Sequence, residues 1–306
     1  MRTAFVGAVE GSAIALDALV RAGMPPDMLI TLEAGAADRH SDFVDLGGRG
    51  QAAGIEVVRT RSVNSQPVLE ALSALEPDLV LVIGWSQICR GAFRSIARMG
   101  NIGFHPAPLP RMRGRAVIPW TILLGEPSTA ATLFWLDEGI DSGPILLQEQ
   151  IAVADDETAR TLYAKQTNAL ASMLPRAVEL ARSGNAPRIE QDHRLATYCA
   201  KRTPDDGRIN WHQPADAILR LIRAAGDPYP GAFTTNENGR LVIDAAASYE
   251  DSHRYIGLAG QVQCETDEGF VVRCGDGECI HVTQWRQGGA SAKPRVHSKL
   301  GAVFAP

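Results

Sequence analysis

The two residues whose side chains could most readily take part in catalysis are a histidine and an aspartate, each at the start of a loop. His105 ends the apolar stretch Asn101–His105, and Asp141 follows 36 positions later, in Asp141–Gly143. A neutral imidazole can donate toward a developing oxyanion or shuttle a proton. A nearby carboxylate fixes the orientation and protonation of the imidazole. The two residues are therefore candidates for acid–base chemistry on a carbonyl group.

The loop after the histidine is stiff and basic. Prolines at positions 106, 108 and 110 hold its backbone extended, which suits a wall that keeps His105 in place. Three arginines follow and would face an anionic part of a substrate, although a solvated basic turn is the alternative. Gly139 and Gly143 bracket Asp141 and permit close approach of a flat ligand. The expected substrate contacts are Pro106, Arg111, Arg113, Gly114 and Arg115.

Alternating strands and helices must position these loops. Apolar runs predict strands near 3–7, 29–32, 57–58, 79–83 and 101–105, with helical patterns at 13–22, 40–53 and 89–98. This alternation indicates an α/β fold with a doubly wound, mostly parallel sheet. Ligands of such sheets bind beyond the carboxyl ends of the strands. We expect the Trp85 loop, His105 and Asp141 to lie at such ends.

The pattern changes in the last third of the chain. A long helical pattern at 158–183 and a short one at 214–225 precede β-rich runs broken by glycines. These runs predict a smaller β-barrel domain, closed or partly closed. We therefore expect a catalytic domain at 1–190, a linker at 191–202 and a C-terminal β-barrel-like domain at 203–306.

Composition narrows the classes of function. The 306 residues are 45% hydrophobic and 21% charged, which is globular composition with room for two domains. A net charge of −5 does not suggest a dedicated polyanion binder. Five cysteines without a Cys-x-x-Cys pair argue against a metal site and predict free thiols in the cytoplasm. We expect no signal peptide and no membrane span.

The motifs His105-Pro-x-x-Leu-Pro, Arg113-Gly114 and Asp141-Ser-Gly-x-Ile-Leu resemble the formyltransferases that use 10-formyltetrahydrofolate. That group includes methionyl-tRNA formyltransferase, glycinamide ribonucleotide transformylase and the nucleotide-sugar N-formyltransferases. The likeness continues in Thr203–Trp211 and Pro228–Phe233, which look like the C-terminal domain of the tRNA and aminoarabinose enzymes. It implies 10-formyltetrahydrofolate as cosubstrate and His105 and Asp141 as catalytic residues. It also implies a folate pocket, formed largely by backbone groups, at Ile83, Trp85, Ser86, Gln87, Ile88, Leu136, Asp137, Gly139 and Ile140.

One position departs from the family pattern. The family has an asparagine two residues before the histidine, where it helps to bind the formyl oxygen; this chain has Gly103. Losing an oxyanion donor can cost about 3–4 kcal/mol. We therefore expect a substitute donor, with Gln87 as the first candidate and Ser86 or an ordered water as alternatives. Asn101 does not replace it, because two residues along a strand span about 6–7 Å.

The sequence favours a nucleotide-linked amino sugar as the acceptor of the formyl group. Residues 201–306 contain 12 Lys and Arg against 13 Asp and Glu, a net charge of −1 by subtraction. A domain that grips tRNA would be basic. Methionyl-tRNA is the alternative acceptor, and Gly103 leaves open a deformylase or a non-catalytic ligand-binding relative. We expect no nucleic-acid or membrane partner. The oligomeric state stays open, with a homodimer among the options.

Overall fold

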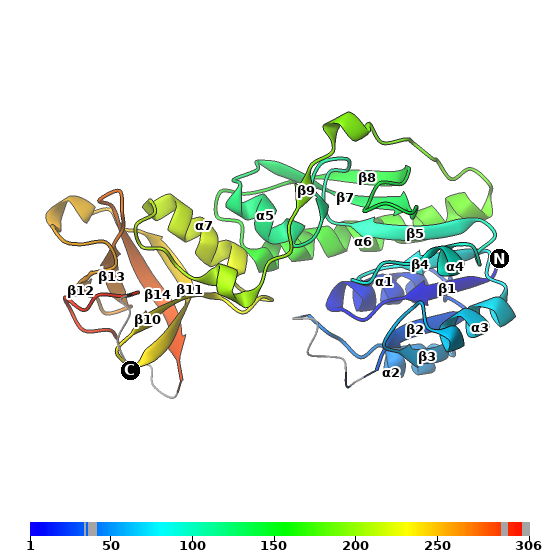
Figure 1. The fold of residues 1–306 in the computed structure, drawn as a ribbon, viewed down its shortest axis with the longest axis horizontal. Coiled ribbons are helices and arrows are strands. Elements are labelled where there is room, and N and C mark those ends of the chain that lie inside the picture. Colours follow the sequence, from blue (N-terminus) through cyan, green and yellow to red (C-terminus); the bar gives the residue numbers. More distant parts are fainter. Residues whose placement is uncertain (34, 36–41, 289–292, 302–306) are drawn as a thin grey trace. The chain divides into compact units, whose positions relative to one another are not determined.

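A computed structural model describes residues 1–33, 35, 42–288 and 293–301 (Figure 1). The chain groups into two compact units. Unit 1 comprises Met1–Val117, Ser128–Ala152 and Tyr163–Ala200, and unit 2 comprises Ile118–Pro127, Val153–Leu162 and Lys201–Pro306. Two short segments from the first two thirds of the chain thus group with the second unit. The sequence predicted instead a division into two domains at a single linker.

Unit 1 is built on a seven-stranded sheet with the order β3-β2-β1-β4-β5-β7-β8. Its strands are β1 (Thr3–Val6), β2 (Met28–Leu32), β3 (Glu56–Thr60), β4 (Leu79–Val82), β5 (Gly100–His105), β7 (Ser128–Trp135) and β8 (Ile145–Ala152). The first five strands are parallel, and β7 and β8 are antiparallel to their neighbours. The predicted doubly wound, mostly parallel sheet is confirmed.

The helices within residues 1–200 are α1 (Glu10–Arg21), α2 (Gly47–Ala52), α3 (Gln66–Leu75), α4 (Gly91–Arg94), α5 (Val117–Leu123) and α6 (Ala159–Arg182). Most of α5 and the first turn of α6 belong to the segments that group with unit 2. Alternate residues of β1, β2 and β4 form one apolar core with Val68 and Leu72 of α3 and Phe93 of α4. Helices α2 and α4 are shorter than the ranges 40–53 and 89–98 that the sequence predicted, and residues 40 and 41 lie outside the described part. None of the described helices is long and apolar enough to span a bilayer.

The direction of β7 affects where the Asp141 loop begins. The register pairs His105 with Thr132 and Ile102 with Trp135, so β7 ends beside the amino end of β5. The Trp85 loop and His105 do follow parallel strands, as expected. The segment 136–144 instead leaves the opposite edge and must fold back along the sheet to bring Asp141 to the histidine. Asp141 therefore lies at the carboxyl end of β5, as expected, although its loop begins at the opposite edge of the sheet.

The predicted linker packs onto the loop that follows β5. The short strand β6 (Arg113–Gly114) pairs in parallel with β9 (Tyr198–Cys199), after the 3-10 helix η2 (His193–Leu195). Residues up to Ala200 group with unit 1. The segment 191–200 is thus part of the framework around the candidate site, beyond its role as a connection.

Unit 2 contains a five-stranded antiparallel sheet with the order β10-β11-β14-β13-β12. Its elements are η3 (Pro204–Gly207), α7 (Ala215–Ala225), β10 (Ala232–Asn236), β11 (Gly239–Ser248), η4 (Ser252–Arg254), β12 (Val262–Glu265), β13 (Phe270–Arg273) and β14 (Cys279–Gln287). The apolar side of α7, with Ile218 and Ile222, packs onto this sheet in a second hydrophobic core (Figure 1). Among the described residues no pairing joins β10 directly to β12, but backbone hydrogen bonds link the segment 297–301 both to 260–262 and to Thr235 of β10, which agrees with the predicted partly closed β domain.

Candidate active site

His105 and Asp141 lie side by side in unit 1. The Nδ1 atom of His105 is 3.6 Å from Oδ2 of Asp141. The predicted proximity of the two residues is confirmed. The histidine residue is only 5% exposed, whereas the Asp141 side chain is 23% exposed. A ligand would therefore approach from the aspartate side, because the imidazole is nearly enclosed.

The two ring nitrogens of His105 have different partners. Nε2 is 2.7 Å from the carbonyl oxygen of Met112. Because a carbonyl only accepts hydrogen bonds, Nε2 carries a proton. The 3.6 Å between Nδ1 and the carboxylate exceeds a normal hydrogen bond, so Nδ1 is the nitrogen left for a substrate atom. The carboxylate of Asp141 is the side-chain group that faces Nδ1.

Asp141 is held in an uncommon backbone conformation. Its φ is +48°, in the left-handed region that Asp and Asn visit more readily than most residues. Its Oδ2 accepts a hydrogen bond of 2.8 Å from the backbone N–H of Gly114. Gly114 has φ +101°, and an added Cβ would lie 2.6 Å from the carbonyl oxygen of Cys199. A glycine is therefore needed where the basic loop passes between Asp141 and β9.

Thr197, which the sequence analysis did not single out, fixes the residue that contacts the histidine. Its hydroxyl accepts a 2.8 Å hydrogen bond from the N–H of Met112, and its carbonyl accepts one of 2.8 Å from Arg113. The N–H of Arg115 donates to the carbonyl of Cys199. These contacts hold the carbonyl of Met112 against His105. A polar segment with backbone contacts carries no apolar period, so its role leaves no signal in the sequence.

Arg113 does not face the substrate side. Its residue exposure is 1%, and its Nε and Nη2 donate to Oε1 of Gln191 at 3.2 and 2.6 Å. Nη1 donates to the hydroxyl of Tyr198 at 3.2 Å, and Nη2 lies 3.1 Å from Nδ1 of His193. The interpretation of Arg113 as a contact to a substrate anion is therefore replaced by a structural role. A buried guanidinium whose donors are used internally cannot reach a ligand.

The other predicted substrate residues are placed differently. Arg111 and Arg115 are exposed, so either can meet an anion, and both stay candidates. The N–H of Gly114 is already bonded to Asp141. Pro106 is partly buried, and its carbonyl accepts from the amide of Gln166. Arg111 and Arg115 are thus the remaining candidates for binding an anionic part of the substrate.

The two loops predicted to hold folate meet at one core. Trp85 and Leu136 both pack against the cluster formed by β1, β2, β4, α3 and α4. Ile88 and Ile140 stand out from these loops with 68% and 54% of their surface exposed. The indole Nε1 of Trp85 is buried and has no hydrogen-bond partner among the described residues. The exposed apolar side chains of these loops suit contact with a flat ring, and the indole N–H of Trp85 is a donor available to an acceptor atom.

The remaining folate candidates have internal contacts. The N–H of Ile83 donates to Val6, and its carbonyl accepts a 2.6 Å hydrogen bond from the hydroxyl of Ser12. The carboxylate of Asp137 accepts from the hydroxyl of Ser142 and the N–H of Gly139. Ser86 is exposed. Ile83 is therefore placed to support the loop, and the ligand contacts would come from its neighbours.

The space beside Gly103 is filled. An added Cβ would lie 2.6 Å from Cδ2 of Leu136 and 3.0 Å from the ring of Phe134. Gly103 pairs with Val82 and shares its face of the sheet with Asn101, whose amide donates to the carbonyl of Arg94. An asparagine side chain does not fit here unless Leu136 and Phe134 move. Asn101 does not replace it, as expected.

Gln87 does not take over the role of the family asparagine. Its Nε2 donates a 2.6 Å hydrogen bond to the carbonyl of Arg61, which follows β3. Strand β3 is four positions from β5 in the sheet, or about 19 Å at the usual spacing of strands. The amide is directed toward that side of the sheet and away from His105. The prediction that Gln87 supplies the missing donor is therefore not supported.

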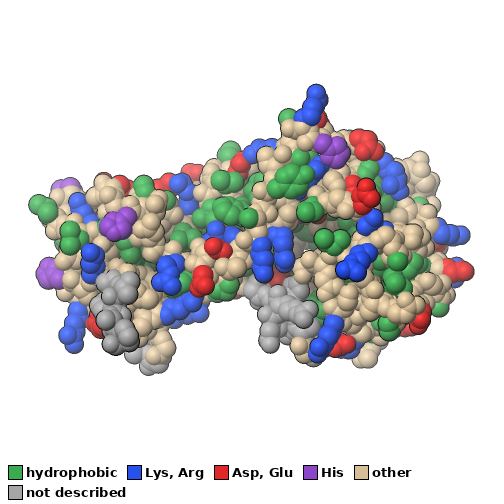
Figure 2. Space-filling model, viewed as in Figure 1, with side chains coloured by type: hydrophobic (Ala, Val, Ile, Leu, Met, Phe, Trp, Pro, Cys, Tyr) green, Lys and Arg blue, Asp and Glu red, His purple; other side chains and the backbone are tan. Residues whose placement is uncertain are grey.

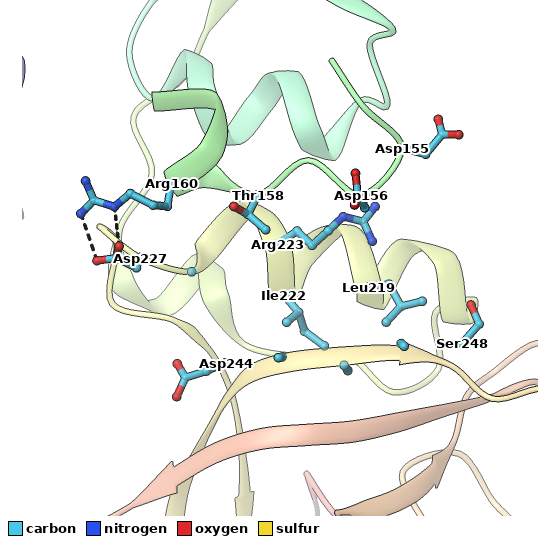
Figure 3. A pocket seen from close by; sticks show the side chains of 14 residues that line it. Asp155, Asp156, Thr158, Arg160, Leu219, Ile222, Arg223, Asp227, Asp244 and Ser248 are labelled. Atoms are coloured by element: carbon cyan, nitrogen blue, oxygen red, sulfur yellow. Dashed lines mark hydrogen bonds and ion pairs between the residues drawn. The ribbon is translucent and has the colours of Figure 1, made fainter. Parts of the chain in front are cut away.

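A cavity of about 550 Å³ lies elsewhere, within unit 2 (Figure 3). Apolar side chains of α7 and β11 form its floor, and Arg160 pairs with Asp227 at its rim. Its lining carries four aspartates, Asp155, Asp156, Asp227 and Asp244, against two arginines, Arg160 and Arg223. None of the predicted site residues lines this cavity. An acidic rim does not suit an anionic nucleotide, so we do not place the acceptor there.

Comparison with known protein families gives two adjacent matches. Residues 32–178 match the family described as formyl transferase, and residues 201–295 match the one described as formyl transferase, C-terminal domain. A methionyl-tRNA formyltransferase of Syntrophus aciditrophicus is 34% identical over 278 residues, covering 90% of this chain and 88% of that relative. One of Moorella thermoacetica is 32% identical, covering 100% of this chain and 98% of the relative.

Solved structures with the same fold include two proteins in complex with a folate. The N-formyltransferase of Helicobacter canadensis, in complex with folinic acid and dTDP-3-aminofucose, aligns with a TM-score of 0.68 and 16% identity over 92% of this chain and 99% of its own. HypX of Aquifex aeolicus, in complex with tetrahydrofolic acid, aligns with a TM-score of 0.67 and 19% identity over 94% of this chain and 44% of its own. At this identity the likeness concerns the fold alone.

Proposed function

Because this chain belongs to the formyltransferase family, we propose that it transfers the formyl group of 10-formyltetrahydrofolate to the amino group of a nucleotide-linked amino sugar. The single observation that carries the formyl transfer is the 3.6 Å approach of His105 Nδ1 to Asp141 Oδ2. The pair combines an imidazole that can hold a second proton with a fixed carboxylate. This is what stabilisation of a developing negative oxygen requires.

Each residue then has one task. The cosubstrate supplies the formyl group. Nε2 of His105 stays bonded to the carbonyl of Met112, which fixes the ring and directs Nδ1 toward the ligand side. A proton at Nδ1 can be donated to the formyl oxygen as the acceptor amine attacks the formyl carbon. When the tetrahedral adduct collapses, that proton returns to Nδ1, the bond from the formyl carbon to the cosubstrate nitrogen breaks, and the proton lost by the amine goes to that nitrogen, which releases tetrahydrofolate. Gly114 holds the carboxylate in place through its N–H.

The loops around Trp85 and Ile140 suit the cosubstrate. The unpaired indole Nε1 of Trp85 offers a donor, and Ile88 and Ile140 offer exposed apolar surface. We propose that Trp85, Ile88, Leu136 and Ile140 contact the folate, with Ser86, Gln87, Asp137 and Gly139 contributing to the same loops. Ligand sites of this kind are largely apolar with a few polar contacts that fix orientation.

The charge of the C-terminal part supports an amino sugar as acceptor. Residues 201–306 have a net charge of −1. On the face that Figure 2 shows, Lys and Arg side chains are scattered among Asp and Glu and form no continuous basic surface. Binding of an RNA backbone depends on several simultaneous phosphate contacts to Lys and Arg. The exposed Arg111 and Arg115 can bind a diphosphate without such a surface.

Methionyl-tRNA is the second candidate acceptor. The specific observation in its favour is the 32–34% identity, over at least 90% of the chain, with proteins named methionyl-tRNA formyltransferase. The salt dependence of the reaction distinguishes the two acceptors. Binding of tRNA weakens steeply with added salt because counterions compete for its many phosphates, whereas a nucleotide-linked sugar has few phosphates to contact.

The test is an acceptor panel with 10-formyltetrahydrofolate in excess. Release of tetrahydrofolate and the mass of the formylated product are measured for several nucleotide-linked amino sugars and for methionyl-tRNA. We expect formylation of at least one amino sugar at a higher kcat/KM than methionyl-tRNA. A faster reaction with methionyl-tRNA reverses the ranking. Formate release without any formylated acceptor would identify a deformylase, and folate binding without turnover would identify a binding protein.

A further inference from the structure

We propose that Gln191 is a positioning residue for Asp141, and this inference rests on the proposed formyl transfer. Gln191 lies in the segment 191–202 that the sequence presents as a linker, and its residue exposure is 5%. Its side-chain amide connects the loop that carries Asp141 with the loop that carries Gly114. No motif assigns it a role, and its importance follows from its contacts alone.

All the hydrogen-bonding capacity of the amide is directed at these two loops. Nε2 donates to the carbonyl of Asp141 at 2.9 Å and to the carbonyl of Gly143 at 2.7 Å. Oε1 accepts from Nη2 of Arg113 at 2.6 Å and from its Nε at 3.2 Å. Two donors and one acceptor are used, so the position requires an amide. A carboxylate could still accept from Arg113 but could not donate to the two carbonyls.

The contacts of Gln191 bear on the conformation of Asp141. The left-handed φ of +48° at Asp141 is sparsely populated and needs support from its surroundings. Gln191 anchors the carbonyl of that same residue and the carbonyl two residues later. Through Arg113 it also holds the strand β6, whose Gly114 N–H binds the carboxylate. Backbone and side chain of Asp141 are thus fixed by one buried amide.

The main test uses Gln191→Glu, which keeps the size and the contact to Arg113 and removes both donors. We expect kcat to fall by roughly 10- to 100-fold, because small displacements of a reacting group have effects of this size. KM for both substrates should stay within about threefold, since no substrate contact is removed. Gln191→Met, of similar volume and without charge, removes both donors and also the acceptor of Arg113, so it should lower kcat at least as much and excludes an effect of the added carboxylate.

A double-mutant cycle asks whether the effect passes through Asp141. In an Asp141→Asn background, Gln191→Glu should lower kcat by less than about twofold further, because residues that act through each other are not additive. Gln263→Glu is the matched control, because Gln263 is another buried glutamine whose Nε2 donates to a carbonyl, in unit 2. It should keep wild-type turnover. Fully additive losses in the cycle, or unchanged kcat in both Gln191 variants, would overturn the proposal.

A second readout does not depend on turnover. Exchange of the Gly114 amide hydrogen, followed by NMR, should be at least about tenfold faster in Gln191→Glu than in the wild type, because its acceptor Asp141 is released. Unchanged exchange at Gly114 would overturn the positioning role even if the wild type formylates an acceptor. If the wild type formylates none, the proposed function fails, and the exchange result still decides whether Gln191 holds Asp141.

Discussion

The two ring nitrogens of His105 have partners of different kinds. The carbonyl of Met112 fixes one proton on Nε2, and the carboxylate of Asp141 stands beside Nδ1. The charge of Asp141 is therefore its main contribution at this distance. Its shape matters less, because an asparagine can still accept from the N–H of Gly114.

Asp141→Asn should therefore remove activity and leave the fold intact. We expect kcat to fall by about 10²–10⁴, the usual range for loss of acid–base assistance, with the melting temperature within about two degrees of wild type. Tetrahydrofolate release and thermal unfolding followed by circular dichroism measure the two effects. A variant that keeps more than a third of wild-type kcat would contradict the role of the carboxylate.

The packing around Gly103 predicts the effect of replacing this glycine. Gly103→Asn restores the family residue but places its Cβ 2.6 Å from Cδ2 of Leu136. We expect a loss of about 1–3 kcal/mol in the free energy of unfolding, the usual cost of overpacking, and no gain in kcat. Adding Leu136→Ala should recover part of that loss. Urea unfolding of both variants measures it; full stability of Gly103→Asn alone would show that Leu136 moves aside freely.

At the scale of elements, the basic loop after β5 is fastened by a strand that comes 85 residues later. Arg113 pairs with Tyr198 in register, and its buried guanidinium is satisfied by neutral side chains of the same late segment. Removing that guanidinium leaves Oε1 of Gln191 without its donors, which costs about 1–3 kcal/mol for a buried acceptor.

Arg113 and Arg115 of this loop should therefore respond differently to substitution. Arg113→Met should lower the free energy of unfolding by about 1–3 kcal/mol and lower kcat, with little change in KM for the acceptor. Arg115→Ala should raise the acceptor KM several-fold and leave stability within about 0.5 kcal/mol, because Arg115 is exposed. Steady-state kinetics and urea unfolding separate the cases. The reverse pattern would return Arg113 to the substrate.

The elements also show what a single sequence can predict. The alternation of apolar strands and helices predicted the sheet, and the motifs around His105 and Asp141 predicted that these two residues lie together. The direction of β7 was not predictable, because a buried strand has the same apolar pattern in either direction. Arg113 was misplaced because arginines are almost never fully buried. The segment 191–202 was taken for a linker because its contacts are made by backbone groups and a few polar side chains.

At the scale of the whole molecule, each unit has its own hydrophobic core, and each core contains a buried cysteine. Cys89 belongs to the core of unit 1 and Cys274 to that of unit 2. Burial raises the pKa of Cys89 to about 12, and burial, with a smaller contribution from Asp276, raises the pKa of Cys274 to about 12. Both thiols therefore stay protonated well above the pH at which an exposed thiol ionises.

This difference predicts a loss of stability at alkaline pH. An unfolded thiol ionises near pH 8.5. Because the pKa of each thiol is higher in the folded protein than in the unfolded chain, the thiols contribute fully to the free energy of unfolding below that pH. This contribution to stability is lost as the pH rises toward 12, by up to ~1.4 kcal/mol per pH unit for each thiol. Urea unfolding at pH 8 and 10.5 should show a smaller pH-dependent loss in Cys89→Ala and in Cys274→Ala than in the wild type. Equal losses in all three proteins would contradict the assignment.

The pairing of β6 with β9 bears on how enzymes of this kind can be recombined. A fragment that stops at residue 190 retains the motifs around His105 and Asp141 but lacks Gln191, Thr197 and β9, so the carbonyl of Met112 and the loop of Asp141 lose their support. A chimera joined inside 191–200 would inherit its catalytic residues from one parent and their framework from the other. Exchange of the C-terminal part between relatives should preserve chemistry only when the junction falls after Ala200, where unit 1 ends.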